Sequence, residues 1–162
     1  MSKILIISDT HFMRKPQLLQ FLSQFNDIDY TIHCGDIYIG FKENDIPHFS
    51  ICKGNNDFAE IPSINSITID NVKFLFTHGH INSYAYKPET LKKLLDQYPA
   101  DVICFGHTHV PYINEENDVL ILNPGSLALS RTYPKRNTYV IYDTEIKKAS
   151  FYDAQTHEMI EI

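Results

Sequence analysis

The stretch KILIISDTH, residues 3–11, runs from an apolar strand directly into two side chains of the kinds that bind metals, Asp9 and His11. Its four consecutive apolar residues, Ile4 to Ile7, are typical of a strand that is covered on both faces. Open α/β sheets bind their ligands beyond the carboxyl ends of such strands. The stretch therefore predicts an α/β fold with a functional site where the first strand ends.

The same arrangement, an apolar run followed closely by oxygen or nitrogen donors, recurs along the chain. The further runs and donors are residues 28–34 with Asp36, residues 48–53 with Asn55, residues 72–76 with His78, and residues 102–105 with His107 and His109. Because each donor follows the end of a predicted strand, we expect all of them to meet at one place.

The rest of the chain predicts further strands and two helices. These elements are helices over residues 15–26 and 88–98, a hairpin of residues 64–69 and 72–76 around Asp70-Asn71, a strand over residues 120–122, and antiparallel strands within residues 138–162. With about seven to ten strands in this order, we expect one domain, residues 1–162, built as a layered α/β sandwich.

The composition is that of a soluble protein, with 43% hydrophobic and 21% charged residues. No apolar run approaches the roughly 18 residues that span a bilayer. The apolar start is too short for a signal peptide, so we expect a cytoplasmic protein that does not associate with membranes. Cys34, Cys52 and Cys104 lie inside apolar runs, which indicates buried free thiols in a reducing compartment.

The net charge of −6, with lysine and arginine not clustered into a stripe, argues against binding to a long nucleic acid. A nuclease that acts on polymers is disfavoured for the same reason. A small phosphate ester remains possible as a ligand, because bound metal ions reverse the local charge.

The candidate ligands carry oxygen and nitrogen donors, and none carries sulfur. They are Asp9, His11, Asp36, Asn55, His78, His107 and His109. This donor set suits Mn, Fe, Zn, Co or Ni rather than a structural zinc. Seven ligands are too many for one ion and fit two divalent ions that share a carboxylate, for which Asp36 is the natural bridge. Two such ions lower the pKa of a shared water and stabilise displacement at phosphorus.

Each motif also has a plainer interpretation when it is taken alone. Gly35-Asp36 is a common turn, and Asn55-Asn56-Asp57 after Gly54 is compatible with an Asx turn. His78 and His80 alone are compatible with surface or core positions. The ordered recurrence at strand ends favours the metal site. His33 and His48 follow no such pattern and are expected in the core or on the surface, and His157 is expected in solvent.

The ordered set of motifs resembles that of the calcineurin-like metallophosphoesterases, and most closely their small bacterial and archaeal phosphodiesterase branch. The matching pieces are Asp9/His11, Gly35/Asp36, Gly54/Asn55/Asp57, His78/Gly79 and Gly106/His107/His109. The resemblance implies a four-layer αββα sandwich with a dinuclear site at the strand ends between two mixed sheets.

The resemblance also implies the division of the ligands between the two ions. One ion would be held by Asp9, His11, Asp36 and His109, and the other by Asp36, Asn55, His78 and His107. The function implied is hydrolysis of small phosphodiesters by a hydroxide that the two ions activate, with Mn²⁺ as the expected metal and Fe, Zn, Ni or Co as alternatives.

The chain departs from the family pattern at Asn56, where many members have a histidine that protonates the leaving group. An amide hydrogen-bonds a phosphate oxygen but is no general acid, and losing the acid costs roughly 10²–10⁴ in rate for a poor leaving group. Activated diesters are therefore the expected substrates in an assay. His80 is a candidate to supply the proton, and Asp57 is expected to orient its neighbours.

A second departure is the short segment of residues 37–47 between two predicted parallel strands. It leaves room for at most a short turn of helix, and we expect an open side of the site that admits a bulky diester. The alternative function is a catalytically weak or inactive scaffold for protein–protein interaction, as in the small retromer subunit. Scaffold relatives tend to lose metal ligands, whereas all the ligands are present here. The natural substrate and the oligomeric state stay open.

Overall fold

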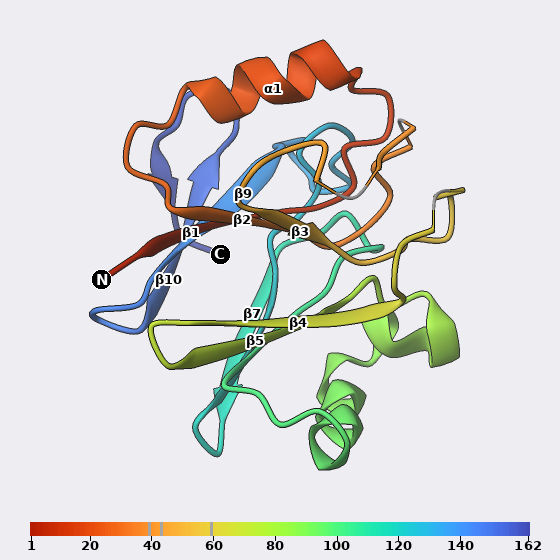
Figure 1. Cartoon of the computed structure of the whole chain (residues 1–162), viewed down its shortest axis with the longest axis vertical. Helices are drawn as coiled ribbons and strands as arrows, with labels where there is room; N and C mark the ends of the chain where they lie inside the picture. Colours follow the sequence, from red (N-terminus) through yellow and green to blue (C-terminus); the bar gives the residue numbers. More distant parts are fainter. Residues whose placement is uncertain (39, 43, 59) are drawn as a thin grey trace.

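The structure is a computed structural model that describes residues 1–38, 40–42, 44–58 and 60–162. Two β-sheets face each other, and helices cover their outer faces (Figure 1). No helix among these residues is long and apolar enough to cross a membrane.

The first sheet has six strands in the order β11-β10-β9-β1-β2-β3. Their bounds are β1 (Lys3–Ile7), β2 (Tyr30–His33), β3 (Phe49–Ile51), β9 (Thr138–Asp143), β10 (Lys148–Asp153) and β11 (Met159–Ile160). β1, β2 and β3 are parallel, whereas β9 to β11 add to the other side of β1 in antiparallel fashion.

The second sheet has five strands in the order β4-β5-β6-β8-β7. Their bounds are β4 (Ile64–Ile69), β5 (Val72–Thr77), β6 (Val102–Cys104), β7 (Tyr112–Glu116) and β8 (Val119–Asn123). β5, β6 and β8 are parallel and form the centre, and an antiparallel strand closes each edge.

Three apolar clusters define four layers. The cluster between the sheets joins side chains such as Ile6 of β1 to side chains such as Phe76 of β5. Helix α1 (Lys15–Ser23) packs Leu18 against the outer face of the first sheet. The 3₁₀ helices η1 (Ile81–Tyr86) and η2 (Pro88–Asp96) cover the outer face of the second sheet. The expected αββα sandwich with two mixed sheets is therefore confirmed.

The structure differs from the sequence prediction in detail. Helix α1 ends at Ser23 rather than at residue 26, and residues 88–96 form a 3₁₀ helix. The described residues hold eleven strands, more than expected. Strand β7 was not predicted, because four of its five residues are exposed and it lacks an apolar face. The described residues of segment 37–47 form no helix, as expected, while Ile39 and Glu43 lie outside the described part.

Hydrogen bonds between loops bring the carboxyl ends of the parallel strands together. In the first sheet, the backbone N–H of Asp9 donates to the carbonyl of Gly35 at 3.0 Å. In the second sheet, the N–H of Gly106 donates to the carbonyl of His78 at 3.1 Å. A hydrogen bond also links the two sheets: the backbone N–H of His107, which follows β6, donates to Oδ2 of Asp9, which follows β1, at 3.1 Å. The polar residues that follow these strands consequently lie close together.

Candidate metal centre

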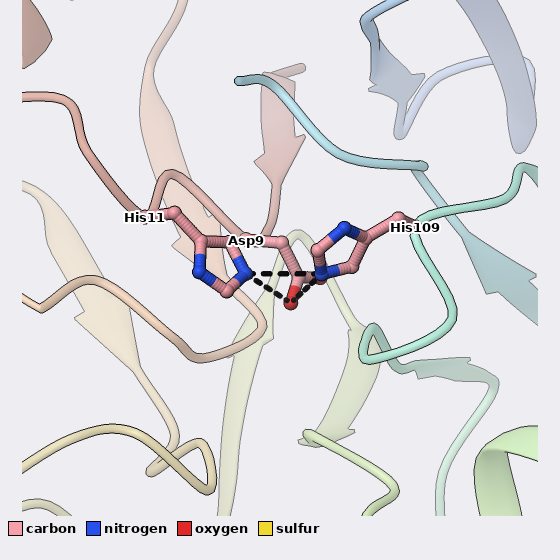
Figure 2. A group of neighbouring side chains, drawn as sticks. All are labelled: Asp9, His11 and His109. Carbon is pink, nitrogen blue, oxygen red and sulfur yellow. Dashed lines mark hydrogen bonds and ion pairs between the residues drawn. The ribbon is translucent and has the colours of Figure 1, made fainter. Parts of the chain in front are cut away.

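Asp9, His11 and His109 form the first group of converging donors (Figure 2). The Nε2 atoms of the two histidines lie 3.0 Å apart. Asp9 Oδ1 lies 3.2 Å from His109 Nε2 and 3.6 Å from His11 Nε2. All three residues are buried, so three donors from the ends of two sheets point at one small volume.

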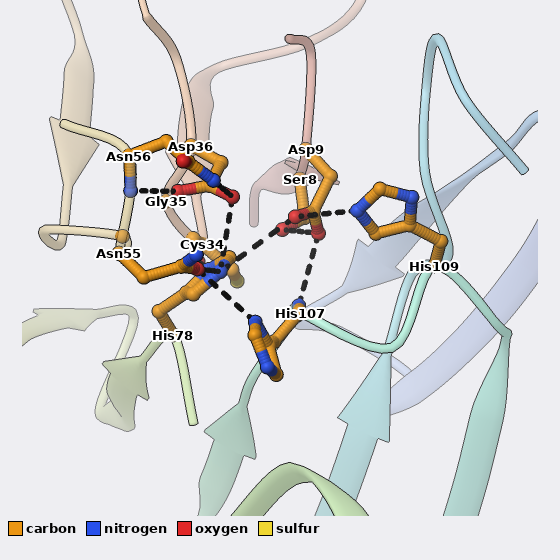
Figure 3. A network of polar contacts seen from close by, with 12 residues as sticks. Ser8, Asp9, Cys34, Gly35, Asp36, Asn55, Asn56, His78, His107 and His109 are labelled. Carbon is orange, nitrogen blue, oxygen red and sulfur yellow. Dashed lines mark hydrogen bonds and ion pairs between the residues drawn. The ribbon is translucent and has the colours of Figure 1, made fainter. Parts of the chain in front are cut away.

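Asp9, Asp36 and His78 form the second group, beside which Asn55 and His107 lie (Figure 3). His78 Nε2 lies 3.4 Å from Asp36 Oδ2 and 3.7 Å from Asp9 Oδ1. Asn55 Oδ1 lies 3.0 Å from His78 Nε2 and 3.1 Å from His107 Nδ1. The structure thus brings together all seven candidate ligands that the sequence suggested.

Two carboxylates reach both groups. Asp9 belongs to each of them. Asp36 Oδ2 lies 3.4 Å from His78 Nε2 and 3.6 Å from His11 Nε2, so it also faces donors of both. Either carboxylate is placed to be shared by two ions, and the bridging role expected of Asp36 stays a prediction.

Backbone carbonyls orient two of the imidazoles. The Nδ1–H of His78 donates to the carbonyl of Cys34 at 2.7 Å, and that of His109 donates to the carbonyl of Leu129 at 2.6 Å. A carbonyl only accepts, so each Nδ1 carries a proton, and Nε2 is the ring nitrogen that faces the centre. Metal-binding histidines commonly have this support.

The centre is electrostatically prepared for cations. Burial opposes ionisation of Asp9, but the imidazoles of His109 and His11 outweigh it and hold its pKa well below the usual range. Burial likewise opposes ionisation of Asp36, yet His78 and Asn56 lower its pKa to about 2. Among the described residues, buried Asp9 Oδ1 has no hydrogen-bond partner. An unsatisfied buried carboxylate oxygen among imidazole nitrogens fits divalent ions well.

Most of the candidate ligands sit in a backbone conformation that non-glycine residues rarely adopt. Positive φ angles occur at Asp9 (52°), His11 (32°), Asp36 (61°), His107 (72°) and His109 (62°). Such residues cost of order 1–3 kcal/mol each and cluster at functional sites, where the surrounding structure enforces them. Turn residues elsewhere, such as Asp70 and Asn117, adopt the same conformation, so it is the concentration of five such positions among the candidate ligands that fits a functional centre.

Gly54 allows two ligand loops to approach closely. A Cβ atom at this position would overlap the carboxylate and the backbone nitrogen of Asp36. Even alanine would therefore displace Asp36, so the glycine before Asn55 is required by packing.

Asp57 fastens the same two loops together. Its carboxylate accepts backbone N–H groups of Asp36, Ile37, Tyr38 and Gly54 at 2.8–3.0 Å. The side chain is buried and touches no candidate ligand side chain in these contacts. This geometry agrees with the expected orienting role.

Asn56 and His80, the two candidates for contact with the leaving group, have different surroundings. The amide of Asn56 donates to Asp36 Oδ2 at 3.0 Å, and its backbone N–H donates to Asp36 Oδ1 at 2.9 Å. The ring of His80 lies 5.4 Å from that of His78 and 6.2 Å from that of His107. Its Nδ1 has no partner among the described residues. Burial and the neighbouring His78 lower the pKa of His80.

Sequence reasoning missed the role of His33, which it assigned only to the core or the surface. The ring is fully buried. The N–H of Gly35 donates to His33 Nδ1, so the proton of the neutral ring is on Nε2 and is donated to Thr10 Oγ1; both distances are 3.0 Å. His33 therefore ties the loop of Asp9 and His11 to the loop of Asp36. Its position three residues before Asp36 was the available signal.

The buried His33 predicts a pH-dependent stability. Burial lowers its pKa from 6.5 to about 4, so between these values the unfolded chain binds a proton that the folded chain excludes. The free energy of unfolding therefore falls as the pH drops through this window, by up to about 3 kcal/mol. Urea unfolding of the metal-stripped protein at about pH 7 and about pH 4.5 measures this change.

The control is His33→Gln, whose unfolding free energy is expected to change less between the two pH values. The comparison is needed because His78, whose pKa Asp36 and Asp9 raise against the effect of burial, acts in the opposite direction in both proteins. Identical pH dependence in wild type and variant would contradict the prediction.

The other histidines play no part in the centre. His48 is exposed. His157 is also exposed, yet its Nδ1 shares a hydrogen bond with the Tyr139 hydroxyl at 2.8 Å, so it is less free than the sequence suggested. The three cysteines are buried free thiols, as expected.

Comparisons with known proteins point in one direction. The family model described as the calcineurin-like phosphoesterase superfamily domain matches residues 2–147. The probable metallophosphoesterase YsnB of Bacillus subtilis is 32% identical over 161 residues, which cover 96% of this chain and 94% of that protein. Phosphodiesterase MJ0936 of Methanocaldococcus jannaschii is 34% identical over 144 residues, which cover 76% of this chain and 82% of that protein.

A solved structure agrees with these relatives. The crystal structure of a predicted phosphoesterase from Streptococcus pneumoniae superimposes with a TM-score of 0.81 and 26% identity, covering 98% of this chain and 92% of that one. The similarity therefore extends over the whole sandwich and includes every strand that carries a candidate ligand.

Proposed function

Since the chain belongs to the calcineurin-like phosphoesterase superfamily, we propose that this phosphoesterase is a dinuclear, metal-dependent phosphodiesterase that hydrolyses small phosphodiesters. The observation that carries the proposal is the convergence of seven oxygen and nitrogen donors from separate strand ends on one centre, with five of them buried and Asn55 and His107 at its accessible side. The name of the archaeal relative, a phosphodiesterase, supports the same reaction class.

The charge of the centre suits a phosphodiester anion. Asp9 and Asp36 are the only carboxylates among the candidate ligands, and the others are neutral imidazoles and an amide. Two divalent ions with these two carboxylates leave a charge of about +2, and a bound hydroxide would lower it to about +1. That charge matches the single negative charge of a diester.

The chain's own residues would bind and orient the reactants. When bound, two divalent ions activate water and neutralise charge that develops at phosphorus. Hydrolysis adds the water oxygen to phosphorus, breaks one P–O ester bond and releases a monoester and an alcohol. Asp57 and His33 hold the ligand loops in place, and Asn56 holds Asp36.

The direct test is hydrolysis of bis(4-nitrophenyl) phosphate by metal-stripped protein to which Mn²⁺, Fe²⁺, Zn²⁺, Co²⁺ or Ni²⁺ is added back. We expect Mn²⁺ to restore activity and elemental analysis to give two metal ions per chain. Absence of hydrolysis with every metal would contradict the proposal and favour the scaffold alternative. Activity on small diesters but not on DNA would separate the proposed enzyme from a nuclease.

Leaving-group dependence tests the roles proposed for Asn56 and His80. Asn56→His is expected to speed hydrolysis of alkyl diesters by roughly 10- to 100-fold, because a general acid protonates a poor leaving group. His80→Gln is expected to slow alkyl diesters by a similar factor. Nitrophenyl diesters need no acid and should change little in either variant.

Rates for methyl 4-nitrophenyl phosphate and dimethyl phosphate, measured for the same protein preparations, give the comparison. If His80→Gln slows both esters equally, His80 is no proton donor.

The proposal also includes a cytoplasmic location, with which three buried free cysteines agree.

A further inference from the structure

Three exposed aromatic side chains border the metal centre. Phe12 is 76% exposed, Tyr38 is 37% exposed and Tyr86 is 62% exposed. Single exposed apolar residues are common on protein surfaces and need no explanation. These three differ because each packs its ring against a candidate metal ligand.

Phe12 and Tyr38 form a pair at one part of the centre. Their ring centroids lie 6.1 Å apart with an interplanar angle of 87°. The Tyr38 ring meets His11 edge-on at 4.8 Å, and the Phe12 ring lies 6.1 Å from His11. His11 belongs to the group that contains Asp9 and His109.

Tyr86 lies at another part of the centre. It is the last residue of η1, and its ring meets that of His107 at 5.6 Å with an interplanar angle of 78°. His107 contacts Asn55 and so belongs with His78 and Asp36. The two ring surfaces therefore flank different ligands, one in each group of donors.

Aromatic surfaces beside the ligands suit the ring systems of an ester substituent. In the part of the chain that the structure describes, no lysine or arginine side chain forms an ion pair or hydrogen bond with Asp9 or Asp36. A flat substrate ring finds exposed aromatic side chains beside His11 and beside His107.

We propose that Phe12, Tyr38 and Tyr86 determine specificity for phosphodiesters whose substituents carry flat ring systems, nucleobases above all. The inference rests on the proposed function and names its substrate class. A diester has two substituents, and with the phosphate at the metal centre one can stack on the Phe12–Tyr38 pair and the other on Tyr86. Stacking on aromatic side chains accepts any base, which suits a dinucleotide-like diester.

The test compares two esters with the same leaving group, thymidine 5′-(4-nitrophenyl phosphate) and ethyl 4-nitrophenyl phosphate, in the Mn²⁺-loaded protein. We expect kcat/KM for the nucleoside ester to be higher by roughly 10-fold. Tyr38→Ala and Tyr86→Ala should each reduce that ratio severalfold, chiefly through KM. Tyr38→Phe and Tyr86→Phe keep the ring and should retain the ratio.

Ile146→Ala serves as the remote control. Ile146 is 66% exposed in the turn between β9 and β10, at the opposite end of the sheet from the centre, and the variant should leave both rates unchanged. Calorimetric binding of slowly hydrolysed phosphorothioate analogues of both esters gives a readout that does not depend on turnover. It should show the same preference.

The outcomes distinguish the proposed specificity for ring-bearing diesters from the proposed phosphodiesterase function. Equal kcat/KM values for both esters, or alanine variants that keep the wild-type ratio, would overturn the inference and leave the phosphodiesterase intact. Failure to hydrolyse either ester would overturn the proposed function and the inference with it. A ratio that falls in the alanine variants and survives in the phenylalanine variants supports the inference.

Discussion

Asp36→Asn is expected to reduce kcat for bis(4-nitrophenyl) phosphate by at least about 10³-fold, because the metal contribution is worth several kcal/mol. Asp36 Oδ2 faces His78 Nε2 at 3.4 Å and His11 Nε2 at 3.6 Å, so its charge serves both groups of donors. An amide keeps the shape of the side chain and removes half of the negative charge of the ligand set. We expect the metal content to fall from about two ions toward one per chain.

Two measurements accompany the rate. Elemental analysis gives the metal content, and urea unfolding of the metal-stripped variant shows whether the fold is retained. A matched control is Asp143→Asn, which changes a carboxylate that accepts backbone N–H groups of Glu145 and Ile146 in the distant β9–β10 turn. If Asp36→Asn keeps two ions and a rate within tenfold of wild type, Asp36 does not bridge the ions.

Asp57→Asn is expected to lower stability by about 2–5 kcal/mol and to weaken metal binding at the same time. The carboxylate accepts four backbone N–H groups from two loops. An amide has one oxygen, and its NH₂ group would face N–H donors, which leaves buried donors unsatisfied. The loop of Asp36 then keeps its hydrogen bonds from Asn56 but loses the attachment through Asp57 to the loop of Asn55.

Thermal unfolding with and without Mn²⁺ measures both effects. The metal-free variant should melt about 5–15 °C lower than wild type, and the added stability from Mn²⁺ should be smaller. Asp143→Asn again serves as the control, because its carboxylate accepts backbone N–H groups in an exposed turn. A variant with wild-type melting and metal affinity would show that Asp57 is dispensable.

The sequence predicted the layers and the ligands because both follow from short-range patterns. Apolar runs such as residues 4–7 are distinctive, and a donor that follows such a strand lies at the carboxyl end of the sheet. The convergence of Asp9 and His109 could therefore be predicted, although the two residues are a hundred positions apart in the sequence.

What the sequence could not provide depends on contacts made only in the folded chain. β7 is a strand because β8 pairs with it, and its residues Tyr112–Glu116 show no apolar face. His33 gains its role from Thr10 and from the N–H of Gly35, which meet it only after β1 and β2 pair. Nor could spacing reveal that Asp9, as well as Asp36, reaches both groups of donors.

The left-handed conformation of Asp9, His11, Asp36, His107 and His109 has an evolutionary consequence. A chain selected for heat resistance alone, without any demand for turnover, would gain by exchanging such residues for glycine or asparagine, which relax there at little cost. Under directed evolution for heat resistance alone, we expect substitutions at these positions before substitutions in the apolar interior. Loss of hydrolytic activity would then begin at the same positions.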